Sequence, residues 1–227
     1  MSMKRVIEIA RSELGEHENP PGSNRVKYWQ DYDPVYQGQP WCVAFLWWVF
    51  QQAGERMAFF GGGKTASCTI LLRWYREQGL TVPVSDVQVG DIVILNFRGK
   101  KEPEHCGLVV DPHWHQDATL DYVYTIEGNT TTSVYGSQDN GGCVAVKTRY
   151  PSQIVGVCRP QYKPEEPEIV DDVSGHWFTP SVEWAREKGL IKNYPDGSFK
   201  PNQAITRAEA CVMLERFYAL LCEDDMR

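Results

Sequence analysis

The chain has 227 residues, 42% of them hydrophobic, and carries a formal net charge of −7. Such a chain holds one large domain, or one medium and one small domain, with a packed core. The acidic balance and the lack of a lysine and arginine cluster argue against nucleic-acid binding, and no apolar run reaches the ~18 residues that span a bilayer.

The first residues form an amphipathic helical pattern. Val6, Ile9 and Leu14 share one side of this pattern with other apolar residues. The segment lacks the short apolar core and the small-residue cleavage site of a secretory signal. We therefore expect a protein made in the cytoplasm without a signal peptide.

Helical periodicity dominates the first part of the chain, and short strand-like runs follow it. Helices are expected over residues 3–14, 42–53 and 66–78. Runs of β-branched and aromatic residues split by turn residues predict strands at 91–97, 105–110, 121–126, 143–149 and 154–160. Helices followed by strands favour an α+β domain, with N-terminal helices packed on a mostly antiparallel sheet.

A segment rich in proline and acidic residues follows, and it contains few apolar side chains that a core could bury. It divides the sequence into a domain at 1–160, an acidic linker at 161–170 and a module at 171–227. The module shows two helical patterns, at 178–191 and 205–221, joined by a turn-rich connection. Thr206 and Glu209 have the spacing of a helix-capping box.

Cys42 stands at the start of the second predicted helix, directly after a Pro-Trp pair. One interpretation is packing, because free cysteine is among the most buried residue types. The other is catalysis, because the electropositive start of a helix lowers the pKa of a thiol and favours the thiolate nucleophile. The helix alone does not decide between them.

A catalytic cysteine also needs a base and a group that orients the base. His105 begins a predicted strand, from which its ring can project toward a helix packed on the sheet. Glu127 and Asn129 end the next strand, although Gly-Asn is also ordinary turn chemistry. His105 alone would fit a hydrogen-bonded edge residue equally well. The remaining histidines lie in polar or distant segments, namely His17, His113, His115 and His176.

The seven cysteines show neither a disulfide nor a zinc pattern. Their odd number in a chain of this length argues against a disulfide framework. No Cys-x-x-Cys pair or close Cys/His cluster is present, which argues against a structural zinc site. No cofactor is expected. The cysteines are Cys42, Cys68, Cys106, Cys143, Cys158, Cys211 and Cys222.

Four segments together resemble the CHAP domain, the cysteine, histidine-dependent amidohydrolase/peptidase family. They are "PWCVAFLWWVF", "EHCGLVV", "TIEGNT" and the tail "NGGCVAVKTRYPSQIVGVCRPQY". The resemblance covers nearly all of residues 1–160 and is strongest to endolysins from phages and prophages of Gram-positive bacteria. It implies a papain-like fold of the CHAP and NlpC/P60 type that cleaves amide bonds in peptidoglycan.

Carried onto this chain, the resemblance makes Cys42 the nucleophile and His105 the general base. It makes Glu127 the group that orients the imidazole, and Asn129 a polar group that helps to stabilise the oxyanion. The backbone N–H of Cys42 is the natural first oxyanion donor. Cys106 departs from the family pattern. Strand alternation points it away from the face of His105, so it is interpreted as packing.

An acidic loop before the nucleophile binds calcium in some members of this family. Asp31 and Asp33 are the weak candidates here, with a longer spacing to Cys42 than the family would lead us to expect. The pattern Asp-x-Asp is also common in loops that bind no metal.

The C-terminal module resembles a single S-layer homology repeat, including the family's "TRAE" at residues 206–209. The resemblance implies a small all-α helix-loop-helix unit that binds secondary polymers of the cell wall. Arg207 is the candidate for the anionic glycan contact, because the cap does not need it and helix starts suit anions. A solvated surface arginine is the alternative. The apolar residues of the last helix can be covered by docking on the catalytic domain or by self-association. Because the repeats of this family pack in threes, the resemblance favours a homotrimer.

Both resemblances together predict a peptidoglycan hydrolase that the module targets to the wall. Its bond specificity, N-acetylmuramoyl-L-alanine amidase or endopeptidase, stays open. The rivals are a catalytically inactive wall-binding or scaffolding protein and a cysteine protease that acts on proteins. Without a signal peptide, an endolysin of this type would reach the wall through a holin or through lysis.

Overall fold

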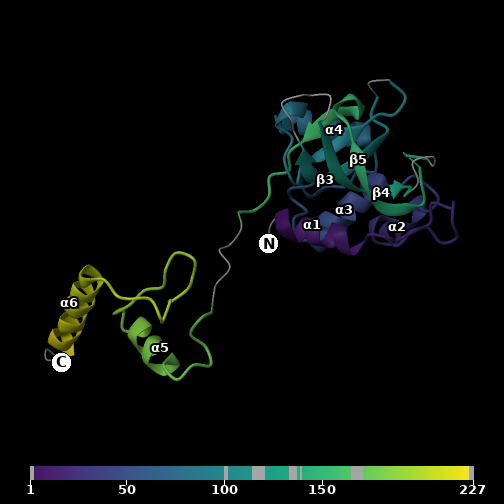
Figure 1. Ribbon diagram of the computed structural model, residues 1–227. Coiled ribbons are helices and arrows are strands. Elements are labelled where there is room, and N and C mark those ends of the chain that lie inside the picture. The colour runs from purple at the N-terminus through teal and green to yellow at the C-terminus, as the bar shows by residue number, and fades with distance from the viewer. Residues whose placement is uncertain are drawn as a thin grey trace. The chain divides into compact units, whose positions relative to one another are not determined.

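The computed structural model describes residues 3–99, 102–113, 121–132, 137–138, 140–164 and 171–224. The chain divides into two compact units, Met1–Pro164 and Glu165–Arg227 (Figure 1). Residues 165–170, which form most of the predicted linker, lie outside the described part of the chain.

The first unit begins with helices. They are α1 (Met3–Ser12), α2 (Lys27–Tyr32), α3 (Cys42–Gln52) and α4 (Cys68–Glu77), with short 3-10 turns at Pro34–Tyr36, Phe60–Gly62, Val84–Asp86 and Pro151–Gln153. The three helices expected from periodicity are present. Helix α2 was not predicted, because six residues are too few to establish a helical repeat.

The strands form one six-stranded sheet in the order β1-β6-β2-β3-β4-β5, and every neighbouring pair is antiparallel. Their bounds are β1 (Thr81–Val82), β2 (Ile92–Leu95), β3 (His105–His113), β4 (Tyr122–Thr130), β5 (Cys143–Arg149) and β6 (Ile154–Cys158). The expected combination of helices with an antiparallel sheet is therefore confirmed.

Helix α3 is the centre of the larger core cluster. Eight of its eleven residues are buried, as expected of a helix that is apolar nearly all round. This cluster contains residues of all four helices, α1, α2, α3 and α4, and alternate residues of the sheet, such as Ile92, Ile94 and Leu108. The intervening residues, such as Val93 and Val109, form a smaller cluster on the opposite face. Figure 1 shows α1, α2 and α3 grouped along one side of the sheet.

The described helices of the second unit are α5 (Thr179–Glu187) and α6 (Arg207–Asp224). The capping box that starts α6 is confirmed. Glu209 Oε2 accepts a bond from the Thr206 backbone N–H at 2.8 Å, and Thr206 Oγ1 accepts one from the Glu209 N–H at 3.2 Å. Because parts of this unit lie outside the described residues, its all-α character stays a prediction.

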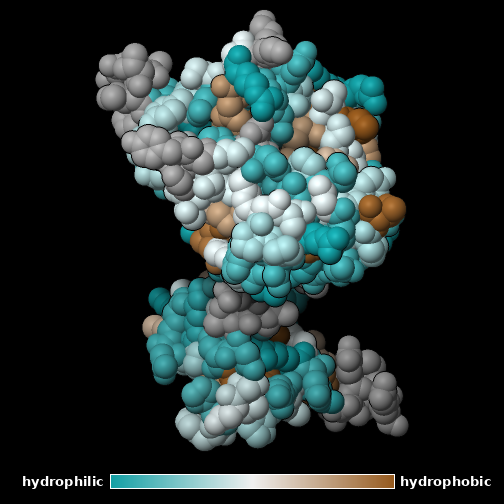
Figure 2. Space-filling model, turned by 90° about the vertical axis from the view of Figure 1, so that its right-hand side faces the viewer, coloured by the Kyte–Doolittle hydropathy of each residue, from teal (hydrophilic) through white to brown (hydrophobic). Residues whose placement is uncertain are grey.

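Within the described residues, the helices are too short or too polar to cross a bilayer. On the face drawn in Figure 2, hydrophobic residues form separate patches among hydrophilic ones.

Candidate active site

The thiol of Cys42 is fixed at the first position of α3. The preceding residue, Trp41, is fully buried, donates its indole N–H to Glu18 Oε1 at 3.0 Å and stacks on Tyr28. These contacts set the chain direction just before the helix begins. The first backbone N–H groups of α3 have no partner within the helix, so this end offers donors and an electropositive field beside the sulfur.

Strand β4 approaches the start of α3 very closely, and a glycine makes this approach possible. A Cβ atom at Gly128 would lie 2.6 Å from Phe45 Cβ and 2.7 Å from Trp41 Cζ3, both on or beside α3. Only glycine tolerates such contacts without a shift of the backbone. The Glu-Gly-Asn sequence is therefore a packing requirement as well as a strand end.

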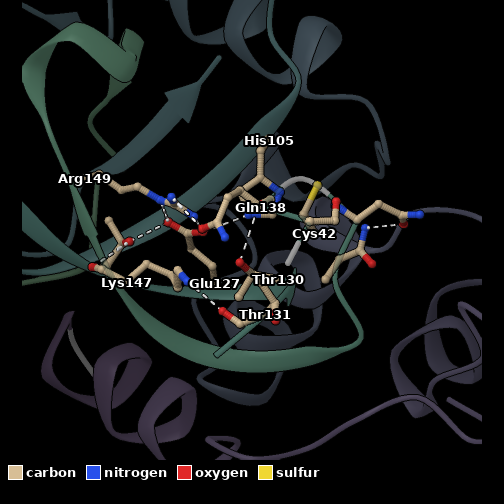
Figure 3. Close-up of polar contacts among 12 residues, drawn as sticks. Cys42, His105, Glu127, Thr130, Thr131, Gln138, Lys147 and Arg149 are labelled. Carbon is tan, nitrogen blue, oxygen red and sulfur yellow. Dashed lines mark hydrogen bonds and ion pairs between the residues drawn. The ribbon is translucent and has the colours of Figure 1, made fainter. Parts of the chain in front are cut away.

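His105 and Glu127 meet across β3 and β4. The imidazole Nε2 lies 2.9 Å from Glu127 Oε2, and both side chains are fully buried. Gly107 leaves room for this carboxylate, since a Cβ there would lie 2.7 Å from Glu127 Cγ. Figure 3 shows the Cys42 side chain beside the His105 ring, with Glu127 and Arg149 on the other side.

Arg149 is a site residue that the sequence reasoning missed. It lies on β5 and is 3% exposed at its side chain. Its Nε donates to Glu127 Oε1 at 2.7 Å and its Nη2 donates to Glu127 Oε2 at 2.6 Å. The Thr125 hydroxyl adds a third bond, to Oε1 at 2.6 Å. The only sequence signal was an arginine at the end of a buried strand, a position where a charge needs a partner.

These contacts set the charges of the pair. Burial alone would raise the pKa of Glu127, but the Arg149 guanidinium and the His105 charge outweigh it and lower this pKa to about 2. Burial alone would lower the pKa of His105, but the Glu127 carboxylate and the Cys42 thiol raise it to about 9. The geometry thus favours an imidazolium held against a carboxylate at neutral pH.

The thiol of Cys42 favours its ionised form. Bonds from the Cys106 and Cys68 thiols, together with the His105 imidazolium, outweigh burial and hold the pKa of Cys42 well below its ordinary value. The contact with the imidazole is loose, because His105 Nδ1 has no partner at ordinary hydrogen-bond geometry among the described residues. Catalytic contacts are often long before substrate binds.

Cys106 is fully buried in the larger core cluster, in agreement with its interpretation as a packing residue. Strand alternation does point it away from His105, which packs instead near Phe97 with a ring separation of 6.0 Å. The opposite face of the sheet is the one that α3 covers. Cys106 is therefore buried with its sulfur within 4.8 Å of the Cys42 and Cys68 sulfurs.

Asn129 lies at the end of β4, fully buried and with a left-handed backbone at φ 58°. Asparagine tolerates this conformation better than most residues do. Its Nδ2 donates to Asn140 Oδ1 at 3.2 Å. The structure thus brings Cys42, His105, Glu127 and Asn129 to one region, where α3, β3 and β4 meet.

The two calcium candidates each bind a protein donor. Asp31 Oδ2 accepts the indole N–H of Trp48 at 2.7 Å, and Asp33 Oδ1 accepts the backbone N–H of Val35 at 3.1 Å. In the described part of the chain, neither belongs to a group of three metal-ligating side chains. Calcium binding at this loop stays a prediction.

The remaining candidates are Arg207 and four histidines. Arg207 belongs to the second unit, where it is the exposed first residue of α6. His17 Nδ1 lies 3.2 Å from the carbonyl oxygen of Gly15, and His113 Nε2 lies 2.9 Å from Asp111 Oδ2. His176 stacks on Phe178 in the second unit, and His115 lies outside the described residues.

Curated relatives match this chain over short segments. Outer membrane protein SlpA of Deinococcus radiodurans is 35% identical over 57 residues, which is 25% of this chain and 5% of that protein. Cell surface glycoprotein 1 of Acetivibrio thermocellus is 48% identical over 42 residues, 18% of this chain and 2% of its own length. The cellulosome-anchoring protein of the same organism is 42% identical over 45 residues, which is 20% of this chain and 10% of that protein. The chain thus spans a tenth or less of the length of these relatives.

These relatives overturn one expectation. The sequence predicted a cytoplasmic protein that reaches the wall through a holin or through lysis. The names of the matching proteins place them at the outer membrane or the cell surface, so a cytoplasmic endolysin is the wrong interpretation. The error came from reading a localisation from the first residues of the chain.

Two family models match separate parts of the chain. One is the CHAP domain, over residues 34–129, and it includes Cys42, His105, Glu127 and Asn129. The other is the S-layer homology domain, over residues 171–211, and it includes Arg207. Residues 34–129 therefore match the CHAP family, and residues 171–211 match the S-layer homology family.

Proposed function

We propose that this protein is a cell-surface peptidoglycan hydrolase with a cysteine nucleophile, anchored by its S-layer homology domain. The buried alignment of Cys42, His105 and Glu127 inside a CHAP domain carries this proposal. CHAP domains indicate cysteine- and histidine-dependent amidohydrolases or peptidases, and S-layer homology domains bind secondary polymers of the wall. A phage origin has no support among the relatives, so a surface-attached enzyme replaces the endolysin interpretation.

The geometry supports a thiol mechanism with a covalent intermediate. The Cys42 thiolate attacks the carbonyl carbon of a wall peptide bond, and His105 gives its proton to the departing amine. Glu127 keeps the imidazole in place and balances its charge. Water then adds to the acyl-enzyme, with His105 taking a proton from it, and the released thiolate is ready for another cycle.

The start of α3 supplies the charge stabilisation that this mechanism requires. The negative oxygen of the tetrahedral intermediate forms next to the attacked carbon, where the Cys42 backbone N–H and the helix field lie. Asn129 is the side chain proposed to add a second donor. Its left-handed backbone at φ 58° is held where β4 packs on α3.

Mass spectrometry of fragments released from purified peptidoglycan tests this function. The wild-type protein should release fragments with new ends at one kind of amide bond, which also decides between amidase and endopeptidase. Cys42→Ala should release none while keeping the circular dichroism spectrum, because alanine is small enough for the site. Cys211→Ala, at an exposed thiol of the second unit, is the matched control and should keep full activity.

Two outcomes would support the rival functions instead. Cleavage of casein without release of wall fragments would indicate a protease that acts on proteins. No cleavage of either substrate by the reduced wild-type protein would indicate an inactive wall-binding protein.

Wall binding is tested separately. Arg207 is exposed at the electropositive start of α6, where an anionic wall polymer would be attracted. Arg207→Ala should reduce sedimentation of the protein with isolated walls. Arg73→Ala, which removes an exposed arginine of the first unit, should leave sedimentation unchanged. Equal losses in both variants would assign the effect to net charge alone.

A further inference from the structure

Three cysteine side chains converge inside the first unit. Cys42 begins α3, Cys68 begins α4, and Cys106 is the second residue of β3. They are 5%, 7% and 0% exposed, and their sulfur atoms all lie within 4.8 Å of one another. In the part of the chain that the structure describes, no other group of three cysteine, histidine or acidic side chains is so arranged.

Apolar packing accounts for each of these cysteines singly but not for their convergence. A free cysteine behaves as a small hydrophobe, and Cys158 on β6 illustrates this, since it is fully buried outside the group. The other three come from three different elements, and their sulfurs lie within 4.8 Å of one another. Polarizable sulfur donors gathered in this way suit a thiophilic metal ion.

The sulfur separations fit a tetrahedral site. Zinc binds cysteine sulfur at about 2.3 Å, which places two sulfurs of a tetrahedron about 3.8 Å apart. Cys42 Sγ and Cys68 Sγ are 3.8 Å apart. The Cys106 sulfur lies within 4.8 Å of both, so a small side-chain rotation would close the remaining edges.

His105 lies beside this group of sulfurs but is not part of it. Its Nδ1 is buried and has no hydrogen-bond partner among the described residues. Figure 3 shows the Cys42 side chain beside this ring. Its Nε2 lies 2.9 Å from the Glu127 carboxylate. The imidazole therefore stays with Glu127, and the three sulfurs are the candidate ligands.

We propose that Cys42, Cys68 and Cys106 bind one thiophilic divalent cation of the zinc type, which holds the enzyme in a reversible inactive state. Zinc in proteins is usually four-coordinate, and water fills the fourth position where the protein supplies three ligands. The ion occupies the sulfur that attacks the substrate. Ligand thiols release their protons to solvent on binding, and removal of the ion restores the free thiolate of Cys42.

The inhibition in this proposal rests on the proposed function, whereas metal binding does not. Binding is therefore measured first, on the full-length chain, reduced and kept free of oxygen. Co²⁺ is the spectroscopic probe, because sulfur-to-cobalt absorption reports thiolate ligands. Zn²⁺ affinity follows from competition with a chromophoric chelator. The wild-type protein should bind one Co²⁺ per chain with thiolate absorption, and Zn²⁺ should displace it.

Single substitutions locate the site. Cys68→Ala and Cys106→Ala each remove one sulfur and should weaken Zn²⁺ binding by about 100-fold or more, since even changes outside the ligand shell cost about 10- to 100-fold. Cys158→Ala removes an equally buried thiol outside the group and should leave the affinity unchanged. A wild-type protein that binds no Zn²⁺, or that forms a Cys42–Cys68 disulfide instead, would overturn the proposal, as would unchanged affinity in Cys68→Ala.

Hydrolysis of purified peptidoglycan then tests the inactive state. Stoichiometric Zn²⁺ should stop the wild-type enzyme, and a chelator should restore it. Relative to its own metal-free rate, Cys68→Ala should need about 100-fold more Zn²⁺ for the same inhibition. A protein that binds the ion but never cleaves walls would overturn the proposed function and leave the metal site standing. An active enzyme that full occupancy by Zn²⁺ does not inhibit would overturn the inactive state.

Discussion

At the scale of single residues, the site depends on one buried carboxylate whose two oxygens both have charged partners. Arg149 binds both oxygens of Glu127, and His105 Nε2 shares one of them. A buried charge is tolerated only when it is paired and hydrogen-bonded. Because these contacts keep Glu127 ionised, it can orient the imidazole and hold its proton at the same time.

This arrangement predicts the alkaline limit of activity. The thiolate and imidazolium pair needs a protonated His105, whose pKa is raised to about 9, so kcat/KM for wall peptides should fall as the pH rises through about 9. Glu127→Gln removes the negative charge that favours the imidazolium. The alkaline limb of the pH profile of kcat/KM should then move to lower pH, by about one unit or more.

The matched control for this profile is Glu77→Gln. Glu77 is an exposed carboxylate on α4, paired with Arg73 at 3.9 Å, and its neutralisation should leave the limb in place. An unchanged limb in Glu127→Gln would show that Glu127 does not set the charge of His105.

At the scale of elements, the site joins three strands of the sheet through side chains that are distant in sequence. In the register of β4 and β5, Arg149 stands opposite Val123, and Glu127 stands opposite Ala145. The arginine therefore reaches along β4 to bind the carboxylate. This contact links β5, at the edge of the sheet, to β4, the strand that carries Glu127.

The element-scale prediction concerns stability. Arg149→Ala leaves the buried Glu127 carboxylate without its guanidinium, and the loss of one partner of a buried pair costs about 3 to 5 kcal/mol of unfolding free energy. Urea denaturation measures this loss. Arg73→Ala breaks an exposed pair on α4, with side chains 66% and 63% exposed, and should cost less than about 1 kcal/mol. Similar losses in both variants would contradict the structural role of Arg149.

Local patterns predicted the elements well, because each depends on near neighbours in sequence. The periodicities gave α1, α3 and α4, and the β-branched runs gave the five long strands. The order of Cys42, His105 and Glu127 was readable because helix starts and strand ends are local features. Arg149 and the thiols of Cys68 and Cys106 were not readable as site neighbours, because only strand register and helix packing bring them there.

At the scale of the whole molecule, the two units differ in how completely they bury apolar side chains. In the first unit, α3 and the sheet enclose a continuous core. In the described residues of the second unit, the buried apolar side chains are Val173, Val182 and Leu190. A unit of this size buries a low fraction of its surface, and α6 leaves large apolar side chains exposed.

These exposed side chains predict self-association of the protein as a homotrimer. They cover more than one side of α6, namely Val212, Met213, Leu214, Phe217, Tyr218 and Leu221, and Tyr218 is 69% exposed. Identical units usually satisfy a shared patch through closed cyclic assembly, and three linked wall contacts would also raise avidity. Light scattering coupled to size exclusion should give three times the mass of one chain.

Charge placed on the apolar surface of α6 should break this assembly. Leu214 is 67% exposed, so Leu214→Glu should cost little folding free energy while burying an unpaired carboxylate in any interface. It should run with the mass of one chain and sediment more weakly with walls. Ser181→Glu adds the same charge at an exposed position of α5 and should stay trimeric. A wild-type protein that is monomeric at high concentration would instead indicate that α6 is covered within its own chain.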